Sequence, residues 1–261
     1  MKVQELFNLS GKTAIVTGGG RGIGKFIATG LAEAGADLVI ASRKFDRLEK
    51  TAEELRSLGV RCLPVKCDMG NRDEILAMVD ATMKEYGTVD ILVNNAGVTW
   101  GAPTLDFPLE QWDRIFNVNV RGVWILSQAV AKIMKEKGGG KMINLSSVMG
   151  FRGSGEEAHP ALPYNSSKAA INLLTMNLAI KLARYNIRVN AIAPGFFHTD
   201  MMGYLDKPEA KPFRDAFLMT IPIPKMGEED DIKGLAVFLA SKASDYMTGA
   251  IIPVDGGMLA K

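Results

Sequence analysis

The sequence predicts an α/β fold in which helices cover both faces of a parallel sheet. Short runs of β-branched and apolar residues recur along the chain, and amphipathic stretches with helical spacing separate them. Strands that are apolar at successive positions are buried on both faces, which is typical of parallel sheets. Hydrophobic residues make up 47% of the 261 residues, enough for a large buried core.

Seven segments have the composition and length of buried strands. In chain order they are Thr13–Thr17, Asp37–Ala41, Val60–Val65, Val89–Val93, Lys141–Leu145, Arg188–Ala193 and Ile251–Val254. Each is a short apolar run, and a helical pattern or a turn signal separates most of them. No linker, repeat or low-complexity stretch divides the chain, so we expect one domain over residues 1–261.

Five of the connections between these strands carry helical signals. A helix is expected over Ile23–Ala34, and the next shows Leu48, Ala52 and Leu55 at helical spacing. Asn71 and Glu74 resemble a capping box in front of a further apolar helical face. Two long helices are expected over Gln111–Lys137, which three glycines end, and from Pro163 to about Tyr185.

The stretch from Gly195 to Met226 has the least regular pattern of the chain. It contains four prolines and is too long for an ordinary connection. We therefore predict a lid over a site at about residues 195–226.

Composition argues against several classes of partner. Lysine and arginine total 31, aspartate and glutamate total 29, and no basic run occurs, so nothing indicates a nucleic acid or an anionic membrane. The N-terminus lacks the apolar stretch of a signal peptide, and no apolar run is long enough to span a bilayer. The two cysteines, Cys62 and Cys67, do not form a zinc motif. We expect a cytoplasmic protein with reduced thiols and no metal.

A glycine-rich turn joins the first predicted strand to the first predicted helix. Its residues 17–24 read TGGGRGIG, with Gly18, Gly22 and Gly24 at positions where the backbone must turn sharply. A phosphate can approach the helix N-terminus there, where free N–H groups and the helix dipole favour anions. A tight strand–helix turn is the alternative interpretation, but the position after a first strand favours dinucleotide binding.

Cations stand where the second predicted strand ends. Ser42 is followed by Arg43 and Lys44, and Arg21 lies in the glycine-rich turn. Enzymes that use NAD usually place an acid at this point to bind the ribose hydroxyls. Cations instead suit the additional 2′-phosphate of NADP, so NADP is the expected cofactor and NAD the less favoured one. Asp68, after the third strand, is expected to bind the adenine amino group or to cap a helix.

Tyr164 and Lys168 lie four positions apart at the start of the last long helix, on one helical face. A phenol with its ordinary pKa of about 10 is a poor acid–base group at neutral pH. A neighbouring cation favours the phenolate and lowers that pKa. The pair therefore indicates proton transfer.

Together these motifs resemble the short-chain dehydrogenase/reductase family over essentially the whole chain. The matching pieces are TGGGRGIG (17–24), NNAG (94–97), Asn119 in NVNV, INLSS (143–147), YNSSK (164–168), PG (194–195) and VDGG (254–257). Their joint occurrence in this order is specific, although each alone is not. The resemblance implies a Rossmann fold, a three-layer α/β/α sandwich with a seven-stranded parallel sheet, and a homotetramer or homodimer.

The resemblance also implies site roles. Ser147, with Ser146 as the alternative, would bond the substrate oxygen, and Tyr164 would exchange its proton. Lys168 would bind the nicotinamide ribose and lower the Tyr164 pKa, and Asn119 would anchor a water chain to Lys168. Further residues expected along the cofactor are Ile23, Met69, Asn95, Ala96, Gly97, Pro194, Gly195, Phe197 and Thr199. The residues expected to line the substrate pocket are Trp100, Met149, Phe196 and Met202.

One feature departs from the family. Tyr164 lies 17 positions after Ser147, a longer spacing than is typical. The additional residues fall within residues 151–162, which we call the insertion and which contain His159. We expect it to form a longer loop beside the substrate pocket.

The expected function is an NADP(H)-dependent oxidoreductase that interconverts a ketone and a secondary alcohol on a small molecule. The apolar lid favours a 3-oxoacyl thioester, and we take this as the main hypothesis. The polar insertion favours a polyol or sugar acid, as in gluconate 5-dehydrogenase-like members. A non-catalytic dinucleotide-binding sensor is the remote alternative, because such relatives usually lose the tyrosine or the lysine, and both are present here.

Overall fold

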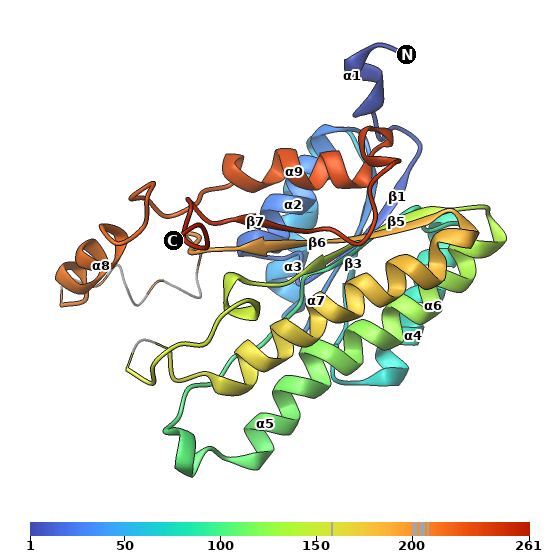
Figure 1. Ribbon diagram of the computed structural model, residues 1–261. Helices are drawn as coiled ribbons and strands as arrows, with labels where there is room; N and C mark the ends of the chain where they lie inside the picture. The colour runs from blue at the N-terminus through green and yellow to red at the C-terminus, as the bar shows by residue number, and fades with distance from the viewer. Residues whose placement is uncertain (158, 200–202, 204–206, 208) are drawn as a thin grey trace.

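Seven parallel strands form a single sheet in the order β3-β2-β1-β4-β5-β6-β7 (Figure 1). The computed structural model describes residues 1–157, 159–199, 203, 207 and 209–261. The strands are β1 (Thr13–Thr17), β2 (Asp37–Ser42), β3 (Cys62–Lys66), β4 (Ile91–Asn94), β5 (Gly140–Leu145), β6 (Ile187–Pro194) and β7 (Ile251–Val254). The predicted α/β class and Rossmann-like sheet are confirmed.

Helices cover both faces of this sheet. The α-helices of the described residues are α1 (Val3–Leu6), α2 (Gly22–Glu33), α3 (Phe45–Arg56), α4 (Arg72–Tyr86), α5 (Leu109–Phe116), α6 (Val123–Glu136), α7 (Leu162–Leu182), α8 (Lys211–Leu218) and α9 (Asp230–Ala240). Of these, α1 and α8 lie outside the layers that cover the sheet. The sequence did not predict α1, α8 or α9. Among the described residues, no helix is both long and apolar enough to cross a membrane.

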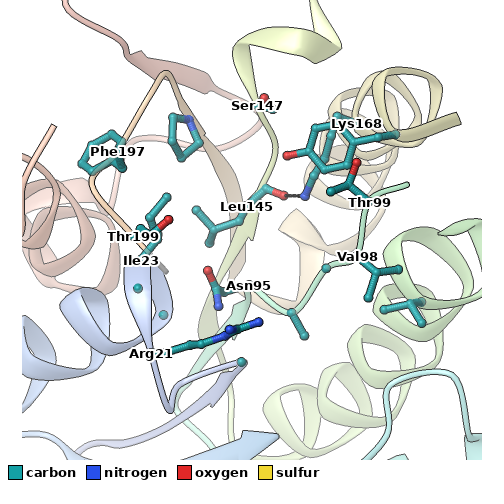
Figure 2. A pocket seen from close by; sticks show the side chains of 18 of the residues that line it. Arg21, Ile23, Asn95, Val98, Thr99, Leu145, Ser147, Lys168, Phe197 and Thr199 are labelled. Atoms are coloured by element: carbon teal, nitrogen blue, oxygen red, sulfur yellow. Dashed lines mark hydrogen bonds between the residues drawn. The ribbon is translucent and has the colours of Figure 1, made fainter. Parts of the chain in front are cut away.

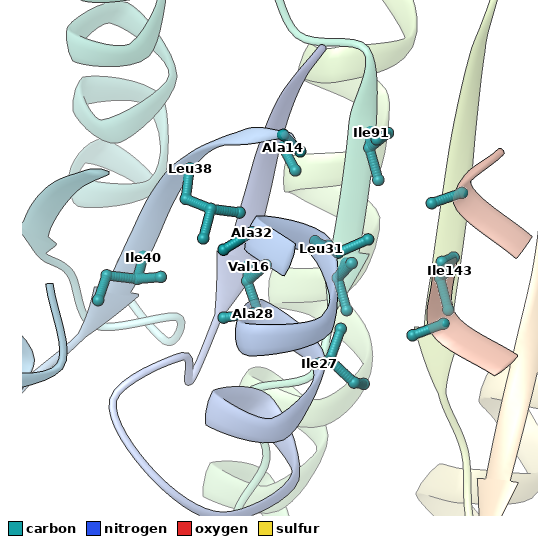
Figure 3. Packing of buried hydrophobic residues seen from close by; sticks show 14 of the residues in the cluster. Ala14, Val16, Ile27, Ala28, Leu31, Ala32, Leu38, Ile40, Ile91 and Ile143 are labelled. Carbon is teal, nitrogen blue, oxygen red and sulfur yellow. The ribbon is translucent and has the colours of Figure 1, made fainter. Parts of the chain in front are cut away.

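Alternate side chains of each central strand enter two separate core layers. Ala14 and Val16 of β1 pack with Ile27 and Leu31 of α2, and this layer also receives α3 and α9 (Figure 3). Ile15, between them, points to the opposite layer, where it packs with residues of α4, α6 and α7. All three β1 side chains are fully buried, which explains why the strand is apolar at successive positions.

The predicted long helix over Gln111–Lys137 is interrupted. After α5, the backbone forms a π-helical turn over Asn117–Gly122 before α6 begins. Gly122 packs so closely that an added Cβ would lie 2.1 Å from the carbonyl oxygen of Met69. A π-type turn of this kind is often found at functional sites, and it carries Asn119.

The strand order reverses at β1, because β2 and β3 lie to one side and β4 to β7 lie to the other. The loops that leave β1 and β4 therefore diverge and open a crevice at the carboxyl ends of the strands. Ligands of open parallel sheets bind at such a switch point. The glycine-rich turn follows β1 and the NNAG segment follows β4 at this edge.

Candidate active site

A cavity of about 460 Å³ lies at the carboxyl ends of the strands. Most of the residues predicted for the site line it (Figure 2). They are Gly18, Arg21, Gly22, Ile23, Gly24, Ser42, Arg43, Lys44, Asp68, Met69, Asn95, Ala96, Gly97, Ser147, Met149, Tyr164, Lys168, Pro194, Gly195, Phe196, Phe197 and Thr199.

Two predicted residues are not brought to this cavity, and a third lies outside the described residues. Asn119 is buried and does not line the cavity. Its side chain bonds the backbone of Val98, which does line the cavity. Trp100 does not line the cavity, and its side chain is 45% exposed, so the expectation that it lines the pocket is not met. The prediction for Met202 lies outside the described residues.

The glycine-rich turn brings the backbone close to both β4 and α2. Gly18 has a φ of +68°, and an added Cβ would lie 2.7 Å from Nδ2 of Asn95. An added Cβ at Gly24 would lie 2.3 Å from the carbonyl oxygen of Gly18. Only glycine fits these two positions, and the close packing places the N-terminus of α2 directly on the cavity. The turn therefore fits a pyrophosphate.

Thr17 ties the end of β1 to the end of β4. Its hydroxyl accepts hydrogen bonds from the backbone N–H groups of Asn95, at 3.0 Å, and Ala96, at 3.1 Å. The Asn95 side-chain amide returns a bond to the Thr17 carbonyl oxygen at 2.8 Å. Thr17 was expected as the end of the first strand and the start of the glycine-rich motif, but no role was predicted for its hydroxyl, because the bonds link residues 78 or 79 positions apart in the sequence.

One end of the cavity is lined by cations from three segments of the chain. Arg43 and Lys44 follow β2, Arg21 comes from the glycine-rich turn, and Arg47 from the first turns of α3 also lines it. Arg47 was not predicted from the sequence. Its position one helical turn after Arg43 was the available signal.

Asp68 lies on the cavity wall. The sequence left two roles open for it, binding the adenine amino group and capping a helix. Its Oδ1 accepts a bond from the Gly70 N–H at 2.8 Å, while the cap of α4 is the side chain of Asn71. Asp68 is thus not the residue that caps α4. Contact with an adenine remains a prediction.

Tyr164 and Lys168 project from the same face of α7 at the other end of the cavity. The helix begins with Leu162 and Pro163, a residue suited to the first turn because its missing N–H needs no partner there. The Lys168 Nζ donates a 2.7 Å bond to the carbonyl oxygen of Leu145, at the end of β5 (Figure 2). It lies 5.5 Å from the centre of the Tyr164 ring.

Burial dominates the protonation of this pair. It raises the pKa of Tyr164, and a hydrogen bond with Ser147 opposes that rise. Burial also lowers the pKa of Lys168 to about 8. We expected Lys168 to lower the pKa of Tyr164, but burial has the larger effect on that pKa and raises it. Removal from water disfavours both charged forms, the phenolate of Tyr164 and the ammonium of Lys168.

The two adjacent serines have different surroundings. The Ser146 hydroxyl bonds the Lys168 carbonyl oxygen and the Asn172 side chain, both inside the fold. The Ser147 hydroxyl accepts a bond from the Met149 N–H at 3.1 Å and also bonds Tyr164. Ser147 is thus the serine whose hydroxyl shares the cavity with the phenol.

Asn119 holds the segment that follows β4. Its side chain accepts a bond from the Val98 N–H and donates one to the Val98 carbonyl oxygen, each at 2.9 Å. A third bond, at 3.1 Å, joins it to the Ser167 hydroxyl on α7. Asn119 therefore links the loop after β4 to the helix that carries Tyr164 and Lys168.

We expect Asn119→Ala to destabilise the fold measurably. The change leaves the part-buried N–H and carbonyl oxygen of Val98 without their partners, at a cost of about 1–2 kcal/mol in the free energy of unfolding. Urea denaturation followed by circular dichroism measures it. An unchanged denaturation midpoint would show that the Asn119 hydrogen bonds contribute nothing to the stability of the fold.

Part of the cavity wall is mainly apolar, and some of it comes from α8. The rings of Phe196 and Phe217 pack with their centres 4.4 Å apart, and both line the cavity with Phe213 and Arg214. The sequence predicted a lid here but not these three α8 residues. Their spacing at positions 213, 214 and 217 was the signal of a helical face.

A glycine-rich turn at the switch point and a buried Tyr–Lys pair at the end of β5 define a dinucleotide-dependent oxidoreductase of CH–OH groups. The chain belongs to the short-chain dehydrogenase/reductase family. The matching family model is described as Enoyl-(Acyl carrier protein) reductase and covers residues 18–259.

Relatives of known activity align over nearly the whole chain. The chain is 38% identical over 257 residues to a 5-keto-D-gluconate 5-reductase of Escherichia coli, covering 98% of this chain and 99% of that one. It is 40% identical over 258 residues to a 2-dehydro-3-deoxy-D-gluconate 5-dehydrogenase of Dickeya dadantii, covering 98% of each. A crystal structure of a gluconate 5-dehydrogenase from Burkholderia cenocepacia in complex with NADP and tartrate superposes with a TM-score of 0.91, at 35% identity and 100% coverage of both chains.

Proposed function

We propose that the chain is an NADP(H)-dependent enzyme that interconverts a keto group and a secondary alcohol on a sugar acid. The observation that carries the chemistry is the meeting of Ser147, Tyr164 and Lys168 at one end of a cavity whose other end is cationic. The substrate class is supported by the relatives, which act on ketogluconate and gluconate. This class was our alternative, and the relatives support it better than the 3-oxoacyl thioester.

Each residue of the proposed machinery has a defined task. In the reductive direction, Ser147 donates a hydrogen bond to the carbonyl oxygen, and Tyr164 transfers its phenolic proton to that oxygen. When bound, NADPH supplies the hydride that reaches the carbonyl carbon. Lys168 binds the nicotinamide ribose and stabilises the phenolate that remains on Tyr164. Asn119 positions the loop after β4 and α7 relative to each other.

The cationic end of the cavity supports NADP over NAD. Arg43, Lys44 and Arg47 lie around the end of β2, where a dinucleotide enzyme that uses NAD has an acid. Arginine binds a phosphate through two parallel hydrogen bonds, which a neutral ribose hydroxyl cannot match. The Burkholderia gluconate 5-dehydrogenase was crystallised with NADP, which agrees with this assignment.

A specific observation supports the thioester as a second candidate. The cavity wall formed by Met149, Phe196 and Phe217 is apolar and would accommodate an acyl chain.

Under either substrate, residues 195–226 act as a lid, with α8 as the part that contacts substrate. Figure 1 shows α8 set apart from the helical layers.

We also propose that the protein works in the cytoplasm as a homotetramer or homodimer. Large apolar side chains remain exposed on α6 and α7, including Trp124 at 42%, Leu173 at 62% and Ile180 at 80%. Exposed apolar surface of this kind is typical of subunit contacts.

The substrate proposal is tested by initial rates of NADPH oxidation. We expect 5-keto-D-gluconate to give a kcat/KM at least about tenfold above that of acetoacetyl-CoA, because the thioester would leave the buried polar atoms of His159 and Asn165 unpaired. The Tyr164→Phe variant serves as the blank for each substrate. Turnover of acetoacetyl-CoA alone would overturn the sugar-acid assignment in favour of the thioester.

A further inference from the structure

The described residues of the insertion, 151–157 and 159–162, are bonded to the loop that follows β4. Its Pro160 carbonyl oxygen accepts a bond from the Ala102 N–H at 3.2 Å, and Oε2 of Glu156 accepts one from the Thr104 N–H at 2.8 Å. These two bonds fix the insertion to the loop that follows β4. The insertion is therefore held in one place relative to Tyr164.

His159 of the insertion lies beside the proposed proton donor. Its ring centre is 5.9 Å from that of Tyr164, and the two planes are inclined by 52°. It lines the active-site cavity. A group on the substrate close to the reacting carbonyl would therefore lie next to this imidazole.

A second cavity of about 470 Å³ lies behind His159. The insertion and the first turn of α7 form most of its lining, and Asn165 contributes to it. His159 and Met149 line both cavities, so they form the boundary between them. A substrate that extends beyond the active site in this direction passes these two side chains.

Two buried polar atoms of residues that line the second cavity lack hydrogen-bond partners among the described residues. They are Nδ1 of His159 and Oδ1 of Asn165. A buried polar atom without a partner costs about 1–3 kcal/mol, so most such atoms in proteins are paired. Here the amide nitrogen of Asn165 does have a partner, since it donates a 3.1 Å bond to the Ser154 hydroxyl.

The chemistry of the two atoms limits what they can bind. An amide oxygen only accepts hydrogen bonds, and a neutral imidazole nitrogen accepts or donates according to its tautomer. Burial lowers the pKa of His159, so the ring is neutral near pH 7. A carboxylate cannot bond the Asn165 oxygen, because neither has a proton, whereas a hydroxyl group satisfies both atoms.

We propose that the insertion forms a specificity subsite, in which His159 and Asn165 bind hydroxyl groups of the substrate beyond the reacting carbonyl. The subsite rests on the proposed reductase function and gives it a structural basis for selecting hydroxylated ketones. His159 binds the hydroxyl nearest to the carbonyl, and Asn165 binds one further along the chain. Both are specificity residues, and neither takes part in proton transfer.

The test measures how His159→Phe changes selectivity between matched ketones. The variant keeps an aromatic ring against Tyr164 and removes both ring nitrogens. We expect kcat/KM for 5-keto-D-gluconate to fall by about 10- to 100-fold, mainly through KM, with less than about a threefold change for butan-2-one. Partial recovery in His159→Asn, which restores a polar atom, is also expected. The Kd of NADPH should stay as in the wild type.

A second variant, Asn165→Leu, should lower kcat/KM for 5-keto-D-gluconate and leave butan-2-one unaffected. Asn177→Leu is its matched control, since Asn177 is an exposed residue of the same helix and bonds only to Leu173 among the interactions described. Equal losses on both ketones, or no loss with either variant, would overturn the subsite.

The subsite proposal can be tested even if the sugar-acid proposal fails. If the wild type reduces butan-2-one and 3-hydroxybutan-2-one but not 5-keto-D-gluconate, the sugar-acid assignment fails. The subsite is then judged on these two ketones, which differ by one hydroxyl group. A drop in their kcat/KM ratio of about tenfold in His159→Phe supports it, and an unchanged ratio refutes it.

Discussion

Replacing Tyr164 with phenylalanine should reduce kcat by about 10³-fold while leaving the Kd of NADPH within about twofold of the wild type. The phenol is the one group at this end of the cavity, among the described residues, placed to exchange a proton with the substrate oxygen, and Ser147 bonds to it. Phenylalanine fills the same buried space beside Lys168 and His159, so the fold should be retained. Stopped-flow absorbance of NADPH and fluorescence titration measure the two quantities.

The pH dependence gives the same residue a second signature. Reduction needs the protonated phenol, and the raised pKa of Tyr164 keeps it protonated at neutral and mildly alkaline pH. Alcohol oxidation needs the phenolate, so its rate should still rise with pH at the alkaline end of the range in which the protein stays folded. The residual rate of Tyr164→Phe should lack this rise.

Tyr86→Phe is the matched control for the Tyr164 variant. Tyr86 is half-buried with its pKa raised to about 12, and its hydroxyl donates a 3.0 Å bond to the Leu38 carbonyl oxygen, away from the cavity. Its loss should leave kcat unchanged. A Tyr164→Phe enzyme with near-normal kcat would support the remote alternative of a non-catalytic dinucleotide-binding protein.

Periodicity and local motifs predicted the sheet and the ends of the site well. All seven predicted strands overlap those of the structure, because a strand buried on both faces must be apolar at successive positions. The Tyr164–Lys168 pair was predictable because four positions make one helical turn. The glycine-rich turn was predictable because only glycine fits at positions 18 and 24, where an added Cβ would collide with neighbouring atoms.

The remaining features depend on contacts between distant parts of the chain. No local pattern indicates that Thr17 bonds the backbone at Asn95 and Ala96, or that burial outweighs Lys168 in setting the Tyr164 pKa. The π-helical turn over Asn117–Gly122 was hidden inside a continuous helical pattern, and the close approach of Gly122 to Met69 is a contact between distant parts of the chain. His159 likewise gains its position from the bonds that hold the insertion.

Arg43→Asp should raise the Kd of NADPH by about 30- to 100-fold and change the Kd of NADH by less than about threefold. Arg43 lines the end of the cavity that follows β2, where the 2′-phosphate is the group that distinguishes the two cofactors. The substitution removes a charge-assisted bond to the phosphate and replaces it with a repulsion. Fluorescence titration of both cofactors at low ionic strength measures the two constants.

The change in net charge is controlled by Arg72→Asp, which makes the same substitution at the first residue of α4. Arg72 is an exposed residue that does not line the cavity, and its side chain is 62% exposed beside Asp73. It should alter neither Kd.

Because Arg43 is also exposed, added salt should weaken the effect of Arg43→Asp on the Kd of NADPH as screening increases. Equal shifts for NADPH and NADH in Arg43→Asp would mean that Arg43 does not contact the 2′-phosphate, and the preference for NADP would then have to arise from Lys44 or Arg47.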